Sequence, residues 1–231
     1  MAGLLSFSFV AADADAQSQY QYNHPLKPFV FSQANANVMV AGKPTDGPDG
    51  PMRDGAWLVS GAGIQDVFEN ATQDKVPTIR HKPSGLICQN PRVVFAPKQS
   101  DPSKFDPTNL SGCIERLNGF QVDFAVAPNG QGGDIQSALS AMTSQIEASD
   151  KGFSKSVDGK NSTASGMQKW PYAWTQLTSS AGDEPRLMQL SIASAGDWIF
   201  MTKTRCWSDQ TLLCRQIGDL ALQQAITSRR P

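Results

Sequence analysis

Apolar residues recur along the chain with two spacings, which predict strands in some segments and helices in others. Short β-prone runs separated by Gly, Pro and Asn predict strands at residues 56–60, 78–81, 86–89 and 92–96. Residues 120–127 begin with alternating apolar and polar positions, as a half-buried strand does. Further strands are expected at 153–157, 170–177, 187–193 and 198–205, and Gly-containing turns typical of hairpins connect the last three.

Two segments have the period of an amphipathic helix. The first follows Asp134, a residue type that favours the N-cap position. Its apolar face consists of Ile135, Ala138, Leu139, Met142 and Ile146. The second segment covers residues 208 to about 226. Its expected inner face consists of Leu212, Leu213, Gln216, Ile217 and Leu220.

This order of elements predicts an α+β fold, an antiparallel sheet with helices packed on one face, preceded by an irregular N-terminal arm. The domain at residues 56–231 follows a possible signal segment at 1–16 and a Pro/Gly/Gln-rich arm at 17–55. Two apolar islands in the arm, at residues 29–31 and 38–40, are candidate edge strands. The alternative interpretation of the arm is a flexible linker.

Composition and the N-terminal pattern favour an exported protein. The 231 residues include 18% charged side chains, against a usual value of about 25%. Residues 4–12 are mainly apolar, as in the central region of a signal peptide. Ala14-Asp15-Ala16 follows, with small residues at the two positions that signal peptidase recognises. No basic residue precedes Leu4, however, as one usually does in a signal peptide. The alternative is an apolar N-terminal extension. No apolar run approaches the roughly 20 residues of a transmembrane helix, so the sequence predicts a periplasmic or secreted protein.

Basic and acidic residues nearly balance, at 20 against 21, and no cluster of Lys or Arg stands out. Nucleic acid is therefore not an expected partner, because binding to its phosphates requires a basic surface.

Four cysteines in an exported chain predict two disulfides, for which three connectivities exist. Spacing favours Cys88–Cys113 and Cys206–Cys214. Cys206 ends a predicted strand, and Cys214 lies in the helix that follows but off its expected apolar face. A cysteine there could reach back to the strand. The alternative is four free thiols in a cytosolic protein.

From about Ile135 onward, the order helix, strands, Gly196-Asp197-Trp198 strand, helix resembles uncharacterised exported proteins of proteobacteria. The element order is similar to that of the PsbP-like α+β fold. Such folds mostly serve accessory or binding proteins, so the resemblance implies a non-catalytic role and transfers no site residue.

No catalytic motif, cofactor motif or metal-ligand spacing is recognisable. His24 and His81 lack the partners of a zinc site or a Ser-His-Asp triad, although His81 lies near the Ser84-Gly85 turn. Gly61-Ala62-Gly63 lacks the third glycine of a dinucleotide fingerprint, since Asp66 takes its place. The acids Asp101, Asp106 and Glu115 fail the EF-hand pattern, which leaves only an irregular calcium site as an alternative.

Trp170, Tyr172 and Trp174 are the candidate ligand-binding residues, because alternate residues of a strand share one face. Exposed, they would form a platform for a sugar or an apolar ligand; buried, they would be core. The favoured function is an exported accessory or binding protein of the cell envelope, without catalytic activity and with its partner or small ligand unknown. The alternatives are a periplasmic hydrolase with a site near His81, or a carrier that uses Trp170 and Trp174.

Overall fold

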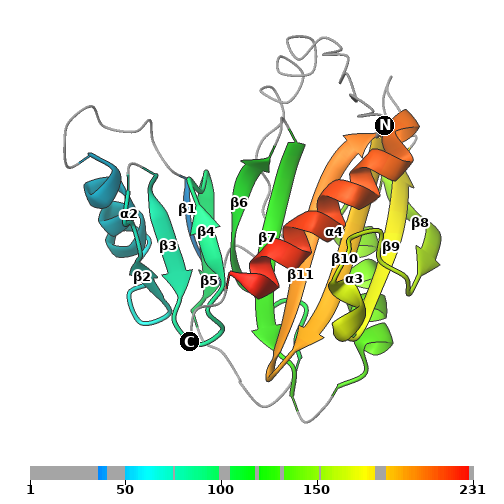
Figure 1. Cartoon of the computed structure of the whole chain (residues 1–231), viewed down its shortest axis with the longest axis horizontal. Helices are drawn as coiled ribbons and strands as arrows, with labels where there is room; N and C mark the ends of the chain where they lie inside the picture. The colour runs from blue at the N-terminus through cyan, green and yellow to red at the C-terminus, as the bar shows by residue number, and fades with distance from the viewer. Residues whose placement is uncertain are drawn as a thin grey trace, which may run out of the picture.

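The computed structural model describes residues 36–40, 50–74, 76–98, 105–117, 120–130, 133–150, 152–179 and 186–228. Within these ranges lie two antiparallel sheets and three α-helices (Figure 1). The large sheet has the order β1 (Ala36–Val40), β5 (Val93–Pro97), β6 (Ser111–Leu117), β7 (Phe120–Pro128), β11 (Trp198–Trp207), β10 (Arg186–Ala195), β9 (Tyr172–Ser179) and β8 (Phe153–Gly159). The small sheet consists of β2 (Phe68–Asn70), β3 (Thr78–His81) and β4 (Ile87–Gln89). The predicted α+β class is confirmed.

The helices are α2 (Gly50–Gly61), α3 (Ile135–Ser149) and α4 (Thr211–Thr227). Asp134 caps α3 as expected, since its carboxylate accepts a hydrogen bond from the Ser137 N–H group. The strand predicted at residues 56–60 is wrong, because these residues belong to α2. Pro51 is compatible with the first turn of a helix, where its missing N–H group costs nothing. Leu58 and Val59 pack against the small sheet, and this contact overrides their β propensity.

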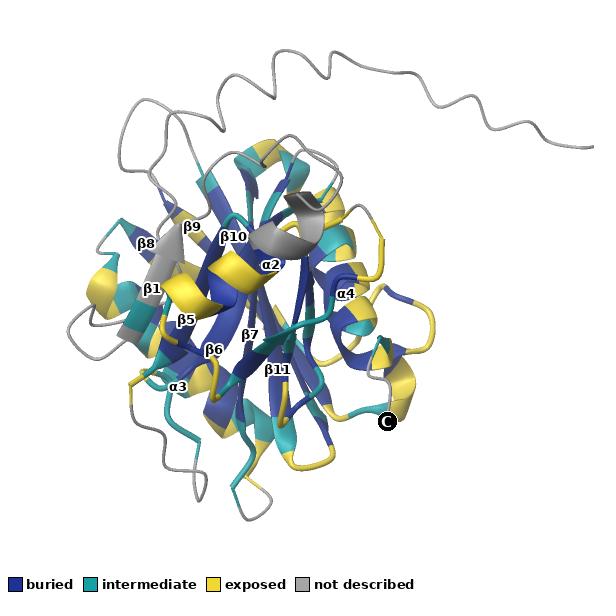
Figure 2. Ribbon diagram, turned by 90° about the vertical axis from the view of Figure 1, so that its left-hand side faces the viewer, coloured by how far each residue is buried: buried dark blue, intermediate teal, exposed yellow. Residues whose placement is uncertain are grey.

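The large sheet is covered on both faces, which corrects the expected packing of helices on one face. On one face, α3 packs against aliphatic residues such as Ala125, Leu190 and Ile192. The opposite face is covered by α4 and by the small sheet with α2. In Figure 2 the central strands are largely buried, with α3 and α4 on opposite sides. Strand β7 shows why both faces of the sheet are covered, since its residues are apolar on both sides. Phe124 and Val126 point toward the α4 side, and Ala125 and Ala127 point toward α3.

The predicted inner face of α4 is wrong for its three leucines, although Ile217 packs against the core as expected. Leu212, Leu213 and Leu220 are 63%, 43% and 57% exposed. The buried side of α4 consists instead of Cys214, Gly218, Asp219, Ala221, Leu222, Ala225 and Ile226. Small residues allow the helix to approach the sheet closely. A Cβ atom at Gly218 would lie 3.1 Å from Gln189 Cγ.

Polar side chains from the sheet meet this side of α4. They are Tyr172, Gln176, Gln189, Ser191, Thr202 and Thr204, and all are buried. The helix is therefore held by hydrogen bonds as well as by apolar packing, for example by the bond from Thr202 Oγ1 to Gly218 O at 2.9 Å. Among the residues described, no helix is both long and apolar enough to cross a membrane.

Candidate functional site

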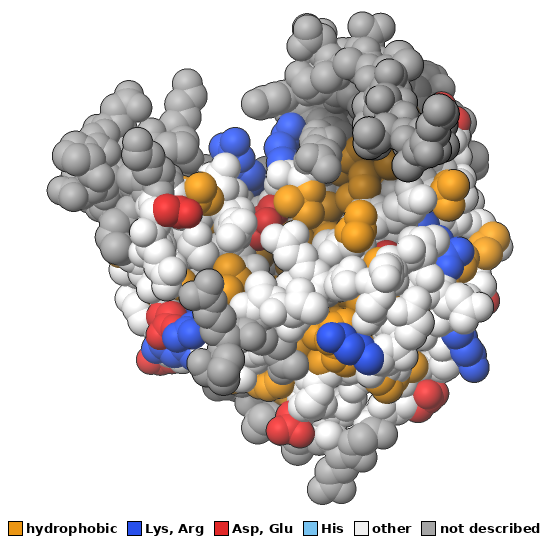
Figure 3. Space-filling model, in the orientation of Figure 1, with side chains coloured by type: hydrophobic (Ala, Val, Ile, Leu, Met, Phe, Trp, Pro, Cys, Tyr) orange, Lys and Arg blue, Asp and Glu red, His pale blue; other side chains and the backbone are white. Residues whose placement is uncertain are grey.

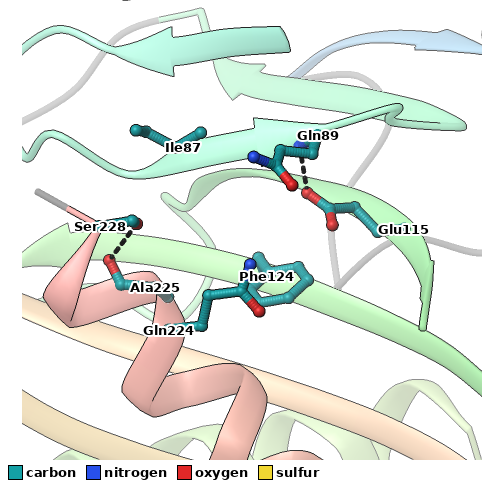
Figure 4. A pocket seen from close by; sticks show the side chains of 7 residues that line it. All are labelled: Ile87, Gln89, Glu115, Phe124, Gln224, Ala225 and Ser228. Atoms are coloured by element: carbon teal, nitrogen blue, oxygen red, sulfur yellow. Dashed lines mark hydrogen bonds between the residues drawn. The ribbon is translucent and has the colours of Figure 1, made fainter. Parts of the chain in front are cut away.

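A cleft of about 190 Å³ opens where the small sheet, the large sheet and the C-terminal end of α4 meet. Figure 4 shows the side chains that line it. They come from β4, β6, β7 and α4 with the turn after it: Ile87, Gln89, Glu115, Phe124, Gln224, Ala225 and Ser228. Of these described lining residues, Glu115 is the only one with an ionisable side chain.

Glu115 is buried at the inner wall of the cleft, with 5% of its surface exposed. Its place on β6 explains this, because alternate residues Cys113 and Glu115 point toward the small sheet while Ile114 points toward α3. One carboxyl oxygen, Oε1, accepts a hydrogen bond from the Gln89 N–H group at 2.6 Å. The other oxygen has no hydrogen-bond partner within the described part of the chain. In Figure 4 it points away from Gln89, to the side of the cleft where Phe124 lies.

Burial raises the pKa of Glu115 from its ordinary value of 4.5 to about 8, and the hydrogen bond from Gln89 opposes this shift only in part. The carboxyl group is therefore mostly protonated and neutral at pH 7. A perturbed acid in a cleft is a common mark of a functional site. The sequence singled out Glu115 only as one member of an irregular calcium site. Of its two suggested companions, Asp106 binds Thr108 of its own loop and Asp101 lies outside the described residues.

The Cys88–Cys113 disulfide holds the two sheets together directly beside Glu115. Both predicted bridges, Cys88–Cys113 and Cys206–Cys214, are confirmed. The ligand atoms of Cys88, Cys113 and Glu115 lie within 4.8 Å of one another, a spacing that suits a metal ion. The oxidised sulfurs are not thiolates, however, and only thiolates bind metals strongly. With the bridge intact, this group does not form a metal centre.

The other lining groups of the cleft offer mainly hydrogen-bond acceptors and one aromatic ring. Ser228 Oγ donates a long hydrogen bond of 3.5 Å to Ala225 O, which leaves its lone pairs for a ligand. The amide groups of Gln89 and Gln224 are exposed at the rim and can present either oxygen or nitrogen. Phe124 contributes its ring between them.

The predicted aromatic residues lie elsewhere, on β9 and just before it. Tyr172 and Trp174 are each 7% exposed and are covered by α4, as the core interpretation expects. Trp174 donates a hydrogen bond to Asn161 O and stacks against Arg215 at 4.2 Å. Trp170 is half-buried beneath Lys169. None of the three lines the cleft, and their role in ligand binding stays a prediction.

Asp219 is a second buried acid, and its environment is the opposite of that of Glu115. Its carboxylate is completely buried and accepts five hydrogen bonds. The donors are the hydroxyl groups of Tyr172, Ser191, Ser162 and Thr163 and the N–H group of Thr163. Asp219 thus joins α4 to two strands and to the loop after β8. Because it lies beneath the helix and is saturated with donors, its role is structural.

A buried ion pair on the α3 face is also structural. Lys203 Nζ lies 2.8 Å from Asp123 Oδ2, and both side chains are almost fully buried. Burial lowers the pKa of Lys203, and the charge of Asp123 opposes this. The two residues face each other on the adjacent central strands β11 and β7.

His81 does not have the environment of a catalytic base. Its Nδ1 atom accepts a hydrogen bond from the Ser84 N–H group at 3.2 Å and lies 2.7 Å from Ser84 Oγ. The ring is 2% exposed, contacts Phe68 and Trp198 edge-on, and bonds to no described carboxylate. Burial lowers its pKa from 6.5 to about 3, which makes it a weak base. The hydrolase alternative gains no support. His24 lies outside the described residues.

Fold and site together define an α+β protein with two antiparallel sheets, two disulfides and a small cleft between the sheets. The sequence matches no family model and no curated protein. Among solved structures, it is similar to cyanobacterial PsbP (CyanoP) from Synechocystis sp. PCC 6803, with a TM-score of 0.36 and 9% identity over 71% of this chain and 86% of that chain. The relation to the PsbP-like fold is therefore weak and carries no functional conclusion. No proteobacterial relative supports the other half of the resemblance.

Proposed function

We propose that the protein is an exported, non-catalytic binding protein that accommodates a small molecule in the cleft beside Glu115. The observation that carries the proposal is the buried carboxyl group of Glu115, one oxygen of which faces the cleft without a described partner. Because the carboxyl group lines the cleft, a small molecule there can pair with this oxygen directly. Two disulfides support the exported location, because such bridges persist in oxidising compartments.

A fragment screen tests this function without assuming the charge of the ligand. The disulfide-intact protein would be titrated with neutral, anionic and cationic fragments while the backbone amide signals are followed by NMR. We expect shifts confined to Gln89, Glu115, Gln224 and Ser228. The variant Gln224→Trp, which places a large ring at the rim of the cleft, should abolish them. If no fragment of any charge shifts these signals, the proposal is overturned.

An accessory role in contact with a protein is the second candidate, because the outer side of α4 carries three exposed leucines, Leu212, Leu213 and Leu220. Figure 3, which views the α4 face, shows hydrophobic side chains gathered on it. The leucines form an apolar side of the helix, so the expected partner surface is an apolar groove.

Photo-crosslinking in the producing cell tests the accessory role. A benzophenone side chain at position 213 should give one discrete adduct, which Leu220→Gln should remove because residues 213 and 220 share a side of the helix. A label at the exposed position Ser140 on α3, which covers the opposite face of the sheet, provides the negative control. Absence of an adduct at position 213 would exclude this surface.

A further inference from the structure

We propose that the cleft beside Glu115 recognises an organic cation, an ammonium group held by the carboxylate of Glu115 next to the ring of Phe124. This inference rests on the proposed function and names its ligand class. The unpartnered oxygen of Glu115 is the first observation. A carboxylate that accepts one backbone hydrogen bond retains several lone pairs for a donor, and an ammonium group carries three donors and no acceptor.

The remaining lining groups fit the same chemistry. Ser228, at the end of the cleft away from Glu115 (Figure 4), donates its hydroxyl proton to Ala225 O and keeps its lone pairs as acceptors. Gln89 and Gln224 can turn their amide oxygens toward the cleft. Phe124 adds an aromatic face, which attracts cations through the negative potential of the ring. The two lining groups that favour positive charge, the carboxyl group of Glu115 and the ring of Phe124, therefore lie next to each other (Figure 4).

The charges around Glu115 disfavour an anionic ligand. The described residues that face it come from β4, β7 and α4 with its following turn, and none of them carries a titratable or charged side chain. Among the described lining residues, an anion would therefore find no cationic partner and would lie against an acid. Size restricts the ligand further, because about 190 Å³ is below the 300–1,000 Å³ of typical pockets for drug-sized molecules. The cleft suits an alkylammonium head group and a short chain.

Binding of a cation should displace the proton of Glu115. The pKa of about 8 means that roughly nine in ten protein molecules carry this proton at pH 7. An ammonium ion favours the ionised carboxylate, so each binding event should release close to one proton. A neutral hydrogen-bond acceptor would instead retain the proton, because the protonated acid is then the donor.

Three probes with the same four-carbon chain separate the ligand classes: n-butylammonium chloride, 1-butanol and sodium butyrate. Dissociation constants come from NMR titration of the disulfide-intact full chain, and proton release comes from pH-stat titration at pH 7. We expect n-butylammonium to bind at least about tenfold more tightly than the other two, which corresponds to about 1.4 kcal/mol. Binding should release about 0.9 proton and shift the Gln89 amide signal.

The variant Glu115→Gln should weaken n-butylammonium binding about tenfold or more and abolish proton release. Glu147→Gln is the matched control, since Glu147 also accepts a backbone hydrogen bond, from Lys155 N at 2.8 Å, but lies outside the cleft. Tighter binding of butanol or butyrate, or ammonium binding unchanged in Glu115→Gln, would overturn the cation assignment while fragment binding at the cleft could still hold. If the fragment screen is also empty, the proposed function fails with it.

Discussion

Replacing Glu115 with Gln should stabilise the protein at neutral pH, although removal of a buried charge-bearing group usually destabilises. The reason is the difference between the pKa of Glu115 in the two states, which is about 8 in the folded protein and 4.5 in the unfolded chain. Glutamine keeps the shape of the side chain and the acceptor for the Gln89 N–H group. Glutamine has no acidic proton, so unfolding of the variant is not favoured by proton release as unfolding of the wild type is.

The magnitude follows from linkage. Below pH 4.5 both states are protonated, and wild type and variant should be equally stable. Between pH 4.5 and 8 the unfolded chain gains by releasing its proton while the folded protein retains it. Wild type therefore loses about 1.4 kcal/mol of stability per pH unit. The variant should be more stable by about 3 kcal/mol at pH 7 and by about 5 kcal/mol above pH 8, where the difference levels off.

Urea unfolding of the disulfide-intact proteins at pH 4.5, 6, 7 and 8.5 measures this difference. For a chain of this length, about 3 kcal/mol corresponds to a melting temperature higher by about 6–12 °C at pH 7. Glu147→Gln should differ from wild type by less than about 0.5 kcal/mol throughout. A Glu115→Gln variant that is less stable than wild type, or whose difference from it does not change with pH, would refute the buried-acid interpretation.

Four further substitutions and one control test the structural assignments. Asp219→Ala should lower the free energy of unfolding by about 3–5 kcal/mol, since it leaves buried donors without an acceptor, whereas Asp209→Asn, exposed near the start of α4, should have little effect. Leu213→Gln should cost less than about 0.5 kcal/mol and Leu222→Ala about 2–5 kcal/mol, the reverse of what the sequence pattern predicts; urea unfolding compares them. Lys203→Met should cost about 3–5 kcal/mol in the same assay, because it removes the cation that neutralises the buried carboxylate of Asp123.

The sequence predicted most strands and both long helices, because their periodicity reflects burial directly. Helix α3 is the clearest case, with every expected core residue except Ile135 buried and Asp134 at the N-cap. The spacing of apolar residues predicted the wrong side of α4. Its three leucines Leu212, Leu213 and Leu220 are large apolar residues, but they point to solvent and not toward the sheet. Gly218 and Ala221 allow a close approach, and Asp219 supplies hydrogen bonds that no hydrophobicity scale counts as favourable.

The Cys206–Cys214 bridge was predicted correctly on a partly wrong argument. Cys214 was expected off the core face of α4, but it is completely buried on the side that faces the sheet. The short separation of eight residues across a strand-to-helix turn was the sound part of the reasoning. Strand β6 was missed because five consecutive buried residues, including Gly112, hide the alternation of a strand. Because β6 was not predicted, the sequence could not place Glu115 at the cleft, and the cleft itself was missed.

Two of the three buried acids among the described residues show why local pattern cannot identify the site. Asp219 and Glu115 are both buried acids, but Asp219 receives five donors and Glu115 receives one. The donors of Asp219 come from segments up to 57 residues away, so only the folded chain reveals that its charge is satisfied. A structural acid stabilises the fold through its partners. The raised pKa of Glu115 predicts that this side chain lowers stability at neutral pH and that glutamine would not, which is the pattern expected of a side chain that serves a ligand.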